Sequence, residues 1–270
     1  MYQRSPGRVA PAARLLLLAV WLAAAGALSA QAPAITLASW TGREATVEES
    51  LRTAKIERIE MVPIGVTNPR RAFFSPGSPF ASAAWKPLRP GMRNGYWESY
   101  KSEIAAYELD KLLEMHMVPP TVEREIDGEK GAVILWLDGV KSWNNKQPVH
   151  GPEPLWSRQI SRMKLFDRLT ANIDRNQGNL LYDNEWHLFL IDHSRAFIDR
   201  SDLAGTAPIQ TVDQTLWERI NAITRPELDR ALGPWLDSRA IDAIVARREK
   251  IREEVKKRVA KAGEAAVYFK

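Results

Sequence analysis

The sequence predicts an α+β protein with two lobes, a β-rich N-terminal half and a mainly helical C-terminal half. Short apolar runs separated by glycine, proline and asparagine fill residues 56–86 and return at 121–137, which is typical of antiparallel strands. Stretches with apolar residues three or four positions apart follow at 156–170 and 212–262, as expected for helices. This order of elements indicates segregated strands and helices, with a functional site expected in the crevice between the lobes.

The composition excludes several classes of protein. The chain has 270 residues, of which 45% are hydrophobic and 26% are charged, as in a globular rather than a disordered protein. It contains no cysteine, which excludes disulfides, cysteine-ligated zinc, iron–sulfur clusters and thiol nucleophiles. The formal net charge is only +5, so we expect no nucleic-acid partner.

The first thirty residues have the pattern of a secretory signal peptide. Three arginines precede an apolar stretch from Leu15 to Leu28, and the small residues Ser29 and Ala30 follow. The apolar stretch is shorter than the roughly 18–20 residues that span a bilayer. We therefore expect cleavage near Ala30 and an exported protein, either secreted or periplasmic. The alternative is an uncleaved N-terminal anchor, which is the one membrane contact that this sequence would allow.

The rest of the chain divides into a short N-terminal segment and one large domain. Residues 31–54 are expected to form a linker or a helix, and residues 55–270 the domain, with its lobes meeting near residue 139. In the first lobe, residues 87–95 are expected to form a loop, 100–116 a helix and 121–137 a hairpin. In the second lobe, the helix 156–170 leads into a polar loop and a short hairpin that returns at 187–191.

The densest group of polar residues lies between positions 172 and 197. Asp174 and Asn179 stand five positions apart before the short hairpin, and Asp192 follows its returning strand. Because a hairpin brings its two ends together, Asn179 and Asp192 can face one point with Asp174 beside them. An amide oxygen and a carboxylate suit a hard cation such as Mg²⁺ or Mn²⁺. A carboxylate near the metal can orient or deprotonate a hydroxyl.

The same spacing is the one that phosphoryl transfer by kinases requires. There, a catalytic-loop Asp precedes a metal-binding Asn by five residues, and a second Asp after a hairpin holds the metals. A strand lysine and a helix glutamate are also needed, and Lys86 and Glu103 stand in that order. Each feature has an ordinary alternative, since loop Asp and Asn cap turns, and an acid beside a helix N-terminus is a dipole partner. Their common order favours the kinase interpretation.

Several segments add a family resemblance. They are Ala84-Trp-Lys-Pro-Leu88, Ser102-Glu-Ile-Ala-Ala-Tyr-Glu-Leu-Asp-Lys-Leu-Leu113, Val118-Pro-Pro-Thr-Val122, Phe166-Asp-Arg-Leu-Thr-Ala-Asn-Ile-Asp-Arg-Asn-Gln-Gly-Asn179 and Leu190-Ile-Asp-His-Ser-Arg-Ala-Phe197. Together they resemble the secretory-pathway kinases of the Fam-twenty (Golgi casein kinase) family. The Asp-Arg…Asn and Ile-Asp pattern is also similar to phosphatidylinositol 3/4-kinases and HipA-type kinases. The resemblance covers about residues 56–200.

The resemblance implies a two-lobed protein-kinase-like fold and an atypical kinase that uses ATP with Mg²⁺ or Mn²⁺. The γ-phosphate would pass to a hydroxyl of a protein, a sugar or a small molecule. Lys86 would bind the nucleotide phosphates, and Glu103 would hold Lys86 or reach the metal. Asp174 would be the catalytic aspartate. Asn179 and Asp192 would bind the metal.

Other positions are less completely assigned by the resemblance. Leu135 to Gly139 would form the hinge beside the adenine. Gly65 or Gly77 would cover the phosphates, but the chain has no G-x-G-x-x-G, which leaves that loop unassigned. Arg175 and Arg195 would contact phosphate or form structural ion pairs, and both alternatives stay open. The aspartates and histidines outside the catalytic set are expected to be structural: Asp110, Asp167, His116, His150 and His187.

A second interpretation is an exported pseudokinase that binds a nucleotide, a metal or a partner without transfer. The animal members of the family are rich in disulfides, whereas this chain has no cysteine, and a bacterial periplasm would supply little ATP. The presence of all five kinase-type polar residues favours transfer.

The positive charge is concentrated in the last part of the sequence. Residues 247–270 hold nine Lys/Arg and four Asp/Glu, so this segment carries the whole positive excess. We expect a basic amphipathic helix whose charged face is solvated.

Overall fold

The structure, a computed structural model, describes residues 39–62, 69–143 and 149–269. All of the described residues belong to one compact unit. The expected signal peptide and its cleavage position lie outside the described residues. Within the described ranges, no helix combines the length and the hydrophobicity needed to cross a bilayer.

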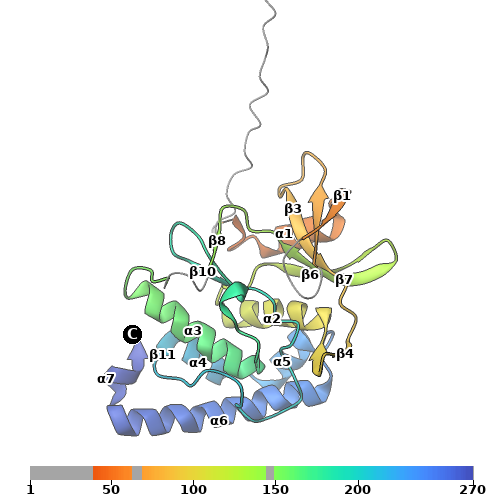
Figure 1. Cartoon of the computed structure of the whole chain (residues 1–270). Coiled ribbons are helices and arrows are strands. Elements are labelled where there is room, and N and C mark those ends of the chain that lie inside the picture. The colour runs from red at the N-terminus through yellow and green to blue at the C-terminus, as the bar shows by residue number, and fades with distance from the viewer. Residues whose placement is uncertain (1–38, 63–68, 144–148, 270) are drawn as a thin grey trace, which may run out of the picture. The chain divides into compact units, whose positions relative to one another are not determined.

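The first lobe is built on a five-stranded antiparallel sheet in the order β1-β2-β3-β7-β6 (Figure 1). The strands span Ile56–Met61, Arg70–Phe74, Ser82–Lys86, Glu129–Leu135 and Thr121–Ile126, in that spatial order. The interior strand β7, between β3 and β6, carries the uninterrupted apolar run that the sequence shows at 132–135, and the sheet is covered on both faces. Val133 and Leu135 face one apolar cluster, while Ala132 and Ile134 face another.

A helix packs against each face of this sheet. Helix α1 (Glu44–Thr53) buries Val47 and Leu51 completely in the cluster that contains Val133. Helix α2 (Tyr100–Leu113) covers the other face through Tyr100 and Ile104. The described part of 31–54 is therefore a helix that shares the core of the sheet and not a free linker.

The expected loop at 87–95 is wrong over its second half, because β4 (Gly91–Arg93) and β5 (Tyr96–Glu98) form a hairpin there. Its turn consists of Asn94 and Gly95, both with positive φ (50° and 82°). This is the conformation that the tightest hairpin turns need, and an Asn-Gly pair adopts it readily. The hairpin leads directly into α2, whose first turn is capped by the Ser99 hydroxyl accepting the Lys101 N–H.

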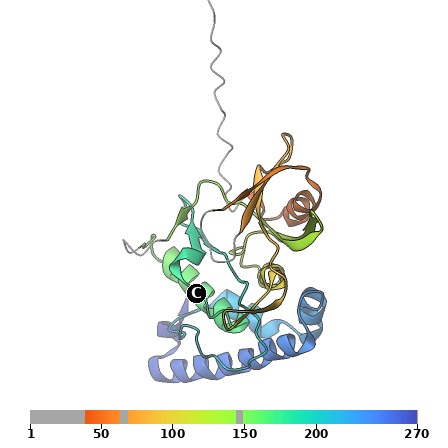
Figure 2. The ribbon, with the colours of Figure 1, turned by 45° about the vertical axis from the view of Figure 1, so that its right-hand side comes forward.

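The second lobe is mainly helical, as expected. Its helices are α3 (Leu155–Thr170), α4 (Gln214–Ala222), α5 (Arg225–Leu232), α6 (Ser238–Ala262) and α7 (Glu264–Val267). The short strands are β8 (Lys141–Ser142), β9 (Leu180–Tyr182), β10 (Leu188–Leu190), β11 (Val212–Asp213) and β12 (Tyr268–Phe269). Helix α6 packs against α3 and α5, and it is the long blue helix in both views (Figures 1 and 2). The antiparallel β9–β10 pair is the short hairpin that the sequence predicts between Asn179 and Asp192.

Asp110 is buried in α2 and has a structural role. One of its carboxylate oxygens accepts the backbone N–H groups of Met117 (3.0 Å) and Val118 (3.1 Å), which hold the chain where it leaves the helix. Burial raises the pKa of Asp110 to about 7, against the opposing effect of these hydrogen bonds.

This pKa predicts a pH-dependent stability. Between the unfolded pKa near 4 and the folded pKa near 7, the folded state binds more protons, so this contribution to stability is full below pH 4 and is lost as the pH rises to about 7. Asp110→Asn keeps an acceptor oxygen and removes the titration. In urea unfolding at pH 4.5, 6 and 8, the wild type should lose about 2–4 kcal/mol relative to this variant. A difference between the two that is constant over this range would contradict the assignment.

Candidate active site

A cavity of about 500 Å³ is lined by β3, β7, the segment after β7 and the β9–β10 hairpin. Most of the residues that the sequence singles out line it: Lys86, Leu135, Gly139, Asn179 and Asp192. Leu135 and Gly139 bound it on the connection that leaves β7, where the hinge was predicted. Most of the remaining wall is apolar and includes Ala84, Ile134, Leu181 and Ile191, while Asp138 and Ser142 add polar groups. A cavity with one polar end and apolar walls suits a ligand with a charged group and a flat apolar ring.

Lys86 forms the centre of the polar end. Its ammonium lies 2.7 Å from Oε1 of Glu103 and 3.0 Å from Oδ1 of Asp192. Lys86 is on β3, Glu103 is on α2 and Asp192 follows β10, so one cation joins three elements of the two lobes. Glu103 is only 3% exposed and lies behind Lys86 instead of lining the cavity. The sequence predicts the order of these residues, and the structure brings them into contact.

Burial and charge set the protonation of this triad. Burial works against the Lys86 ammonium, but the two carboxylates outweigh it and raise the pKa of the lysine. Burial also opposes ionisation of Asp192, and the adjacent Lys86 nevertheless lowers its pKa to about 2. Burial raises the pKa of Glu103, with the negative Asp192 adding to the effect and Lys86 opposing it. Asp192 is therefore an anion at neutral pH.

The backbone around Asp192 is held in an uncommon conformation. Asp192 has a φ of +60°, in the left-handed region that residues other than glycine seldom adopt. Two contacts support it, since Oε2 of Glu103 accepts the His193 N–H (2.9 Å) and the Ser194 hydroxyl donates to Oδ1 of Asp192 (3.1 Å). Strain of this kind is tolerated where the surrounding structure fixes a functional side chain.

The loop before β9 places Asn179 beside Asp192. The Asn179 amide nitrogen donates to the carbonyl of Asp174 (3.0 Å), and the Asn172 side chain accepts the Asp174 N–H (3.2 Å). With its nitrogen engaged, the Asn179 side chain has its oxygen left as an acceptor, and Asp192 keeps Oδ2. These two oxygens are the donor types that Mg²⁺ and Mn²⁺ prefer.

This donor set fits a metal that is also bound by its substrate. Within the described ranges, no cluster of three or more His, Asp and Glu side chains is arranged to hold a metal ion. One amide and one carboxylate oxygen leave most of a six-coordinate shell to phosphate oxygens and water, as for Mg²⁺ at nucleotide sites.

Arg175 fixes the relative position of the two halves of the site. Its guanidinium forms a forked ion pair with the buried Asp167 (3.1 Å) and donates to the carbonyls of Asn179 (3.0 Å) and Ile191 (2.8 Å). Its Nη2, which also donates to Oδ1 of Asp167 (3.1 Å), lies 2.8 Å from Nε2 of His193. Burial and Arg175 lower the pKa of His193 well below its usual value, so the ring is neutral and can accept this bond at Nε2. Arg175 and Asp167 are structural partners here.

Asp174 lies outside the main cavity. It lines an adjacent cavity of about 290 Å³ with Tyr96, Ile173 and Arg195, among other residues. Arg195 donates from Nη1 to Oδ2 of Asp174 (3.0 Å) and pairs with Glu98 (2.7 Å). Arg195 is thus in ion pairs too. Sequence reasoning missed Tyr96 and Glu98, because they reach the site from a hairpin nearly a hundred residues away in the chain.

Two glycines, Gly65 and Gly77, were candidates for a loop that covers the phosphates. Gly65 lies outside the described residues. The residues that flank its segment, Val62 and Pro69, line the main cavity. Gly77 is in the turn between β2 and β3, with φ +96°, and is not part of the described lining.

An antiparallel sheet that supplies Lys86 and a mainly helical lobe that supplies Asn179 and Asp192 face one cavity, and Asp174 from the same loop lines a second one. This arrangement is a kinase-like fold, and solved structures of the Golgi casein kinase and of hydra Fam20 share it. Golgi casein kinase with Mn/ADP bound matches with a TM-score of 0.63 and 16% identity, over 83% of this chain and 78% of that one. The structure of hydra Fam20 with sugar matches with a TM-score of 0.64 and 18% identity, over 83% and 91%.

A further structure of the Golgi casein kinase gives a TM-score of 0.62 at 16% identity, over 83% and 78% of the two chains. No protein-family model and no curated protein sequence matches the chain. The two-lobed, kinase-like fold predicted from the sequence is therefore confirmed, and it is the fold of the Fam20 kinases.

Proposed function

We propose that this protein is an atypical kinase that transfers the γ-phosphate of ATP to a hydroxyl acceptor and depends on Mg²⁺ or Mn²⁺. The observation that carries the proposal is the contact of Lys86 with both Glu103 and Asp192 at the polar end of the 500 Å³ cavity. A buried ammonium with two carboxylates and a neighbouring Asn179 is an arrangement for phosphates and a divalent cation. The Golgi casein kinase structure with bound Mn/ADP supports this choice of ligands.

The position of each side chain at the cavity suggests its role in binding the nucleotide and the metal. Lys86 would neutralise charge on the nucleotide phosphates while Glu103 holds it in place. Asn179 and Asp192 would hold the divalent cation, which neutralises the phosphate oxygens when it is bound. The apolar walls, with Leu135 and Gly139, would receive the adenine ring.

Asp174 would act on the acceptor. It would orient the acceptor hydroxyl and take its proton while the hydroxyl oxygen forms a bond to the γ-phosphorus. The bond between that phosphorus and the bridging oxygen of the β-phosphate breaks, and ADP leaves with its electron pair. The acceptor class, whether protein serine or threonine, sugar or small molecule, is open in this proposal.

A transfer assay with ATP and Mg²⁺ or Mn²⁺ tests the proposal on residues 31–270. The wild type should release ADP, whereas Asp174→Ala and Asp192→Ala should lose about 10²–10³-fold or more in kcat. Asp183→Ala is a suitable control, because this aspartate is buried elsewhere, where it pairs with His187 (2.9 Å). Equal turnover by the wild type and both site variants would refute the kinase proposal.

The alternative, an exported pseudokinase, predicts binding without turnover. ATP and the divalent cation would raise the melting temperature of the wild type and not that of Asp192→Ala, while no ADP would form. The contact of Lys86 with Glu103 and Asp192, in a cavity that Asn179 also lines, supports transfer over this alternative.

We also propose export after cleavage near Ala30, with an uncleaved anchor as the alternative. The basic and apolar N-terminal pattern supports it. The N-terminal sequence of the protein recovered outside the cytoplasm should begin near residue 31. Recovery of the full-length chain in the cytoplasm would contradict export.

A further inference from the structure

Asp174 has a single described contact to its carboxylate. The side chain is about one-third exposed, and within the described ranges only Arg195 donates to it, from Nη1 to Oδ2 at 3.0 Å. No described side chain donates to its Oδ1, and Asp174 lines a 290 Å³ cavity together with Tyr96 and Arg195. A hydrogen bond to one oxygen of a carboxylate fixes the orientation of its other oxygen. Proton transfer from a bound hydroxyl needs a base with a fixed orientation.

The β4–β5 hairpin holds Arg195 in turn. Glu98 is 3% exposed, and its Oε1 accepts from Arg195 Nη2 (2.7 Å) and Nε (2.8 Å). The guanidinium also lies over the Tyr96 ring, 4.4 Å from its centroid. The Ser99 N–H, at the end of the hairpin, donates to the Ser194 carbonyl (3.0 Å). Three contacts thus join the hairpin to the segment that follows Asp192.

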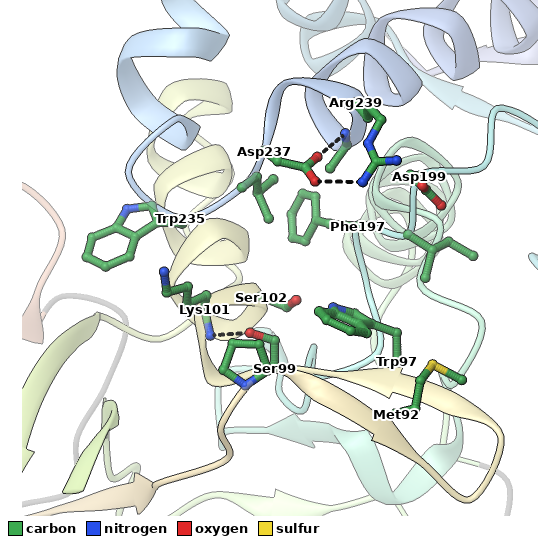
Figure 3. A pocket seen from close by; sticks show the side chains of 14 residues that line it. Met92, Trp97, Ser99, Lys101, Ser102, Phe197, Asp199, Trp235, Asp237 and Arg239 are labelled. Carbon is green, nitrogen blue, oxygen red and sulfur yellow. Dashed lines mark hydrogen bonds and ion pairs between the residues drawn. The ribbon is translucent and has the colours of Figure 1, made fainter.

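The pairing of the two hairpin strands shows which side chains share a face of the hairpin. Met92 pairs with Trp97, while Gly91 pairs with Glu98 and Arg93 with Tyr96, so Tyr96 and Glu98 share the face toward Arg195. Met92 and Trp97 point the other way, into a different cavity of about 450 Å³ beside Ser99 and Asp199 (Figure 3). They are 65% and 47% exposed. Substitutions can therefore alter one face and leave the other intact.

We propose that Arg195 is a positioning residue for Asp174, and that the β4–β5 hairpin holds Arg195 in place through Glu98 and Tyr96. The catalytic half of this inference rests on the proposed kinase function, and the structural half does not. Arg195 forms ion pairs with two carboxylates, the buried Glu98 and the proposed catalytic Asp174. Glu98 holds the guanidinium in place, and the guanidinium in turn orients the Asp174 carboxylate.

The first test measures the hairpin without turnover. In Arg195→Gln, amide hydrogen exchange in residues 96–98 should accelerate about tenfold, because the hairpin loses its contacts to the segment after Asp192. Exchange in α6 should stay at the wild-type rate, which shows that the variant is folded. Unchanged exchange at 96–98 would overturn the hairpin's role, whether or not the protein is a kinase.

The second test measures catalysis with ATP in the transfer assay. Arg195→Gln should lower kcat by about 10–10²-fold, and the KM for ATP should stay within about twofold, because Arg195 does not line the nucleotide cavity. Tyr96→Leu should lower kcat, and Tyr96→Phe, which keeps the ring under the guanidinium, should restore it. Met92→Ala on the opposite face is the matched control and should keep the wild-type kcat.

The outcomes separate the two proposals. A wild type that turns over and an Arg195→Gln variant with unchanged kcat would overturn the positioning role and leave the kinase function standing. A wild type without turnover would refute the kinase function and with it the catalytic half of this inference, and hydrogen exchange would still decide the structural half.

Discussion

Lys86→Met is expected to lower kcat/KM for ATP by about 10²–10³-fold and to destabilise the protein by about 3–5 kcal/mol. The methionine side chain fills a similar volume but removes the charge between Glu103 and Asp192. Glu103 is then a carboxyl group buried at 3% exposure without its cation, and it must take up a proton or pull in water. Steady-state kinetics and urea unfolding measure the two effects separately.

The double variant Lys86→Met/Glu103→Gln separates stability from activity. The glutamine keeps an oxygen that can accept the His193 N–H and carries no charge, so most of the lost stability should return. Activity should stay at the level of Lys86→Met, because the nucleotide phosphates still lack their cation. Wild-type turnover in the double variant would show that Lys86 has only a structural role.

Arg175→Met should destabilise the protein by a similar amount, about 3–5 kcal/mol, and should also abolish transfer. It leaves Asp167 unpaired at 4% exposure and frees the carbonyls of Asn179 and Ile191, which lie directly beside the proposed metal ligands. Thermal unfolding and the ADP-release assay give the two readouts.

The matched comparison is Arg175→Met/Asp167→Leu, which replaces the buried ion pair by apolar side chains. Such a replacement commonly restores stability. Turnover should not recover, because Asn179, Ile191 and His193 remain without their shared donor. Recovery of both properties would mean that Arg175 only neutralises Asp167 and does not order the site.

The local parts of the site could be predicted from the sequence. Asp174, Asn179 and Asp192 lie within nineteen residues, and the hairpin between the last two is visible in the apolar pattern. The meeting of Asn179 and Asp192 thus follows from chain geometry. The pairing of Lys86 with Glu103 is less local, and only the order of elements and a family resemblance indicated it.

The contacts made across the fold could not be predicted. Glu98 and Arg195 are 97 positions apart, and nothing in either segment marks the other as a partner. The β4–β5 hairpin was missed because its strands have only three residues each, too few for an alternating pattern to show. The Asn94-Gly95 pair was the available signal.

In the basic segment 247–270, the sequence pattern held information that our prediction did not use. We expected its charged side chains to be solvated, but Arg247 in α6 is fully buried. Its guanidinium donates to the carbonyls of Leu169 (2.9 Å), Ile198 (3.1 Å) and Arg200, and burial lowers its pKa to about 10. Arg247 stands three residues after Ile244 and four before Ile251, on the apolar face of its helix, so its position within the pattern was more informative than its charge.

The burial of Arg247 also affects which parts of the chain can reach their final structure during translation. Every proposed site residue is translated by position 195, but the carbonyls of Ile198 and Arg200 acquire this donor only when residue 247 has been made and α6 has docked. A nascent chain that has left the ribosome as far as α5 therefore holds the whole site sequence, while the carbonyls of Ile198 and Arg200 still lack this donor. The segment that holds Ile198 and Arg200 therefore reaches its final structure only after α6 has been made, later than the site residues themselves.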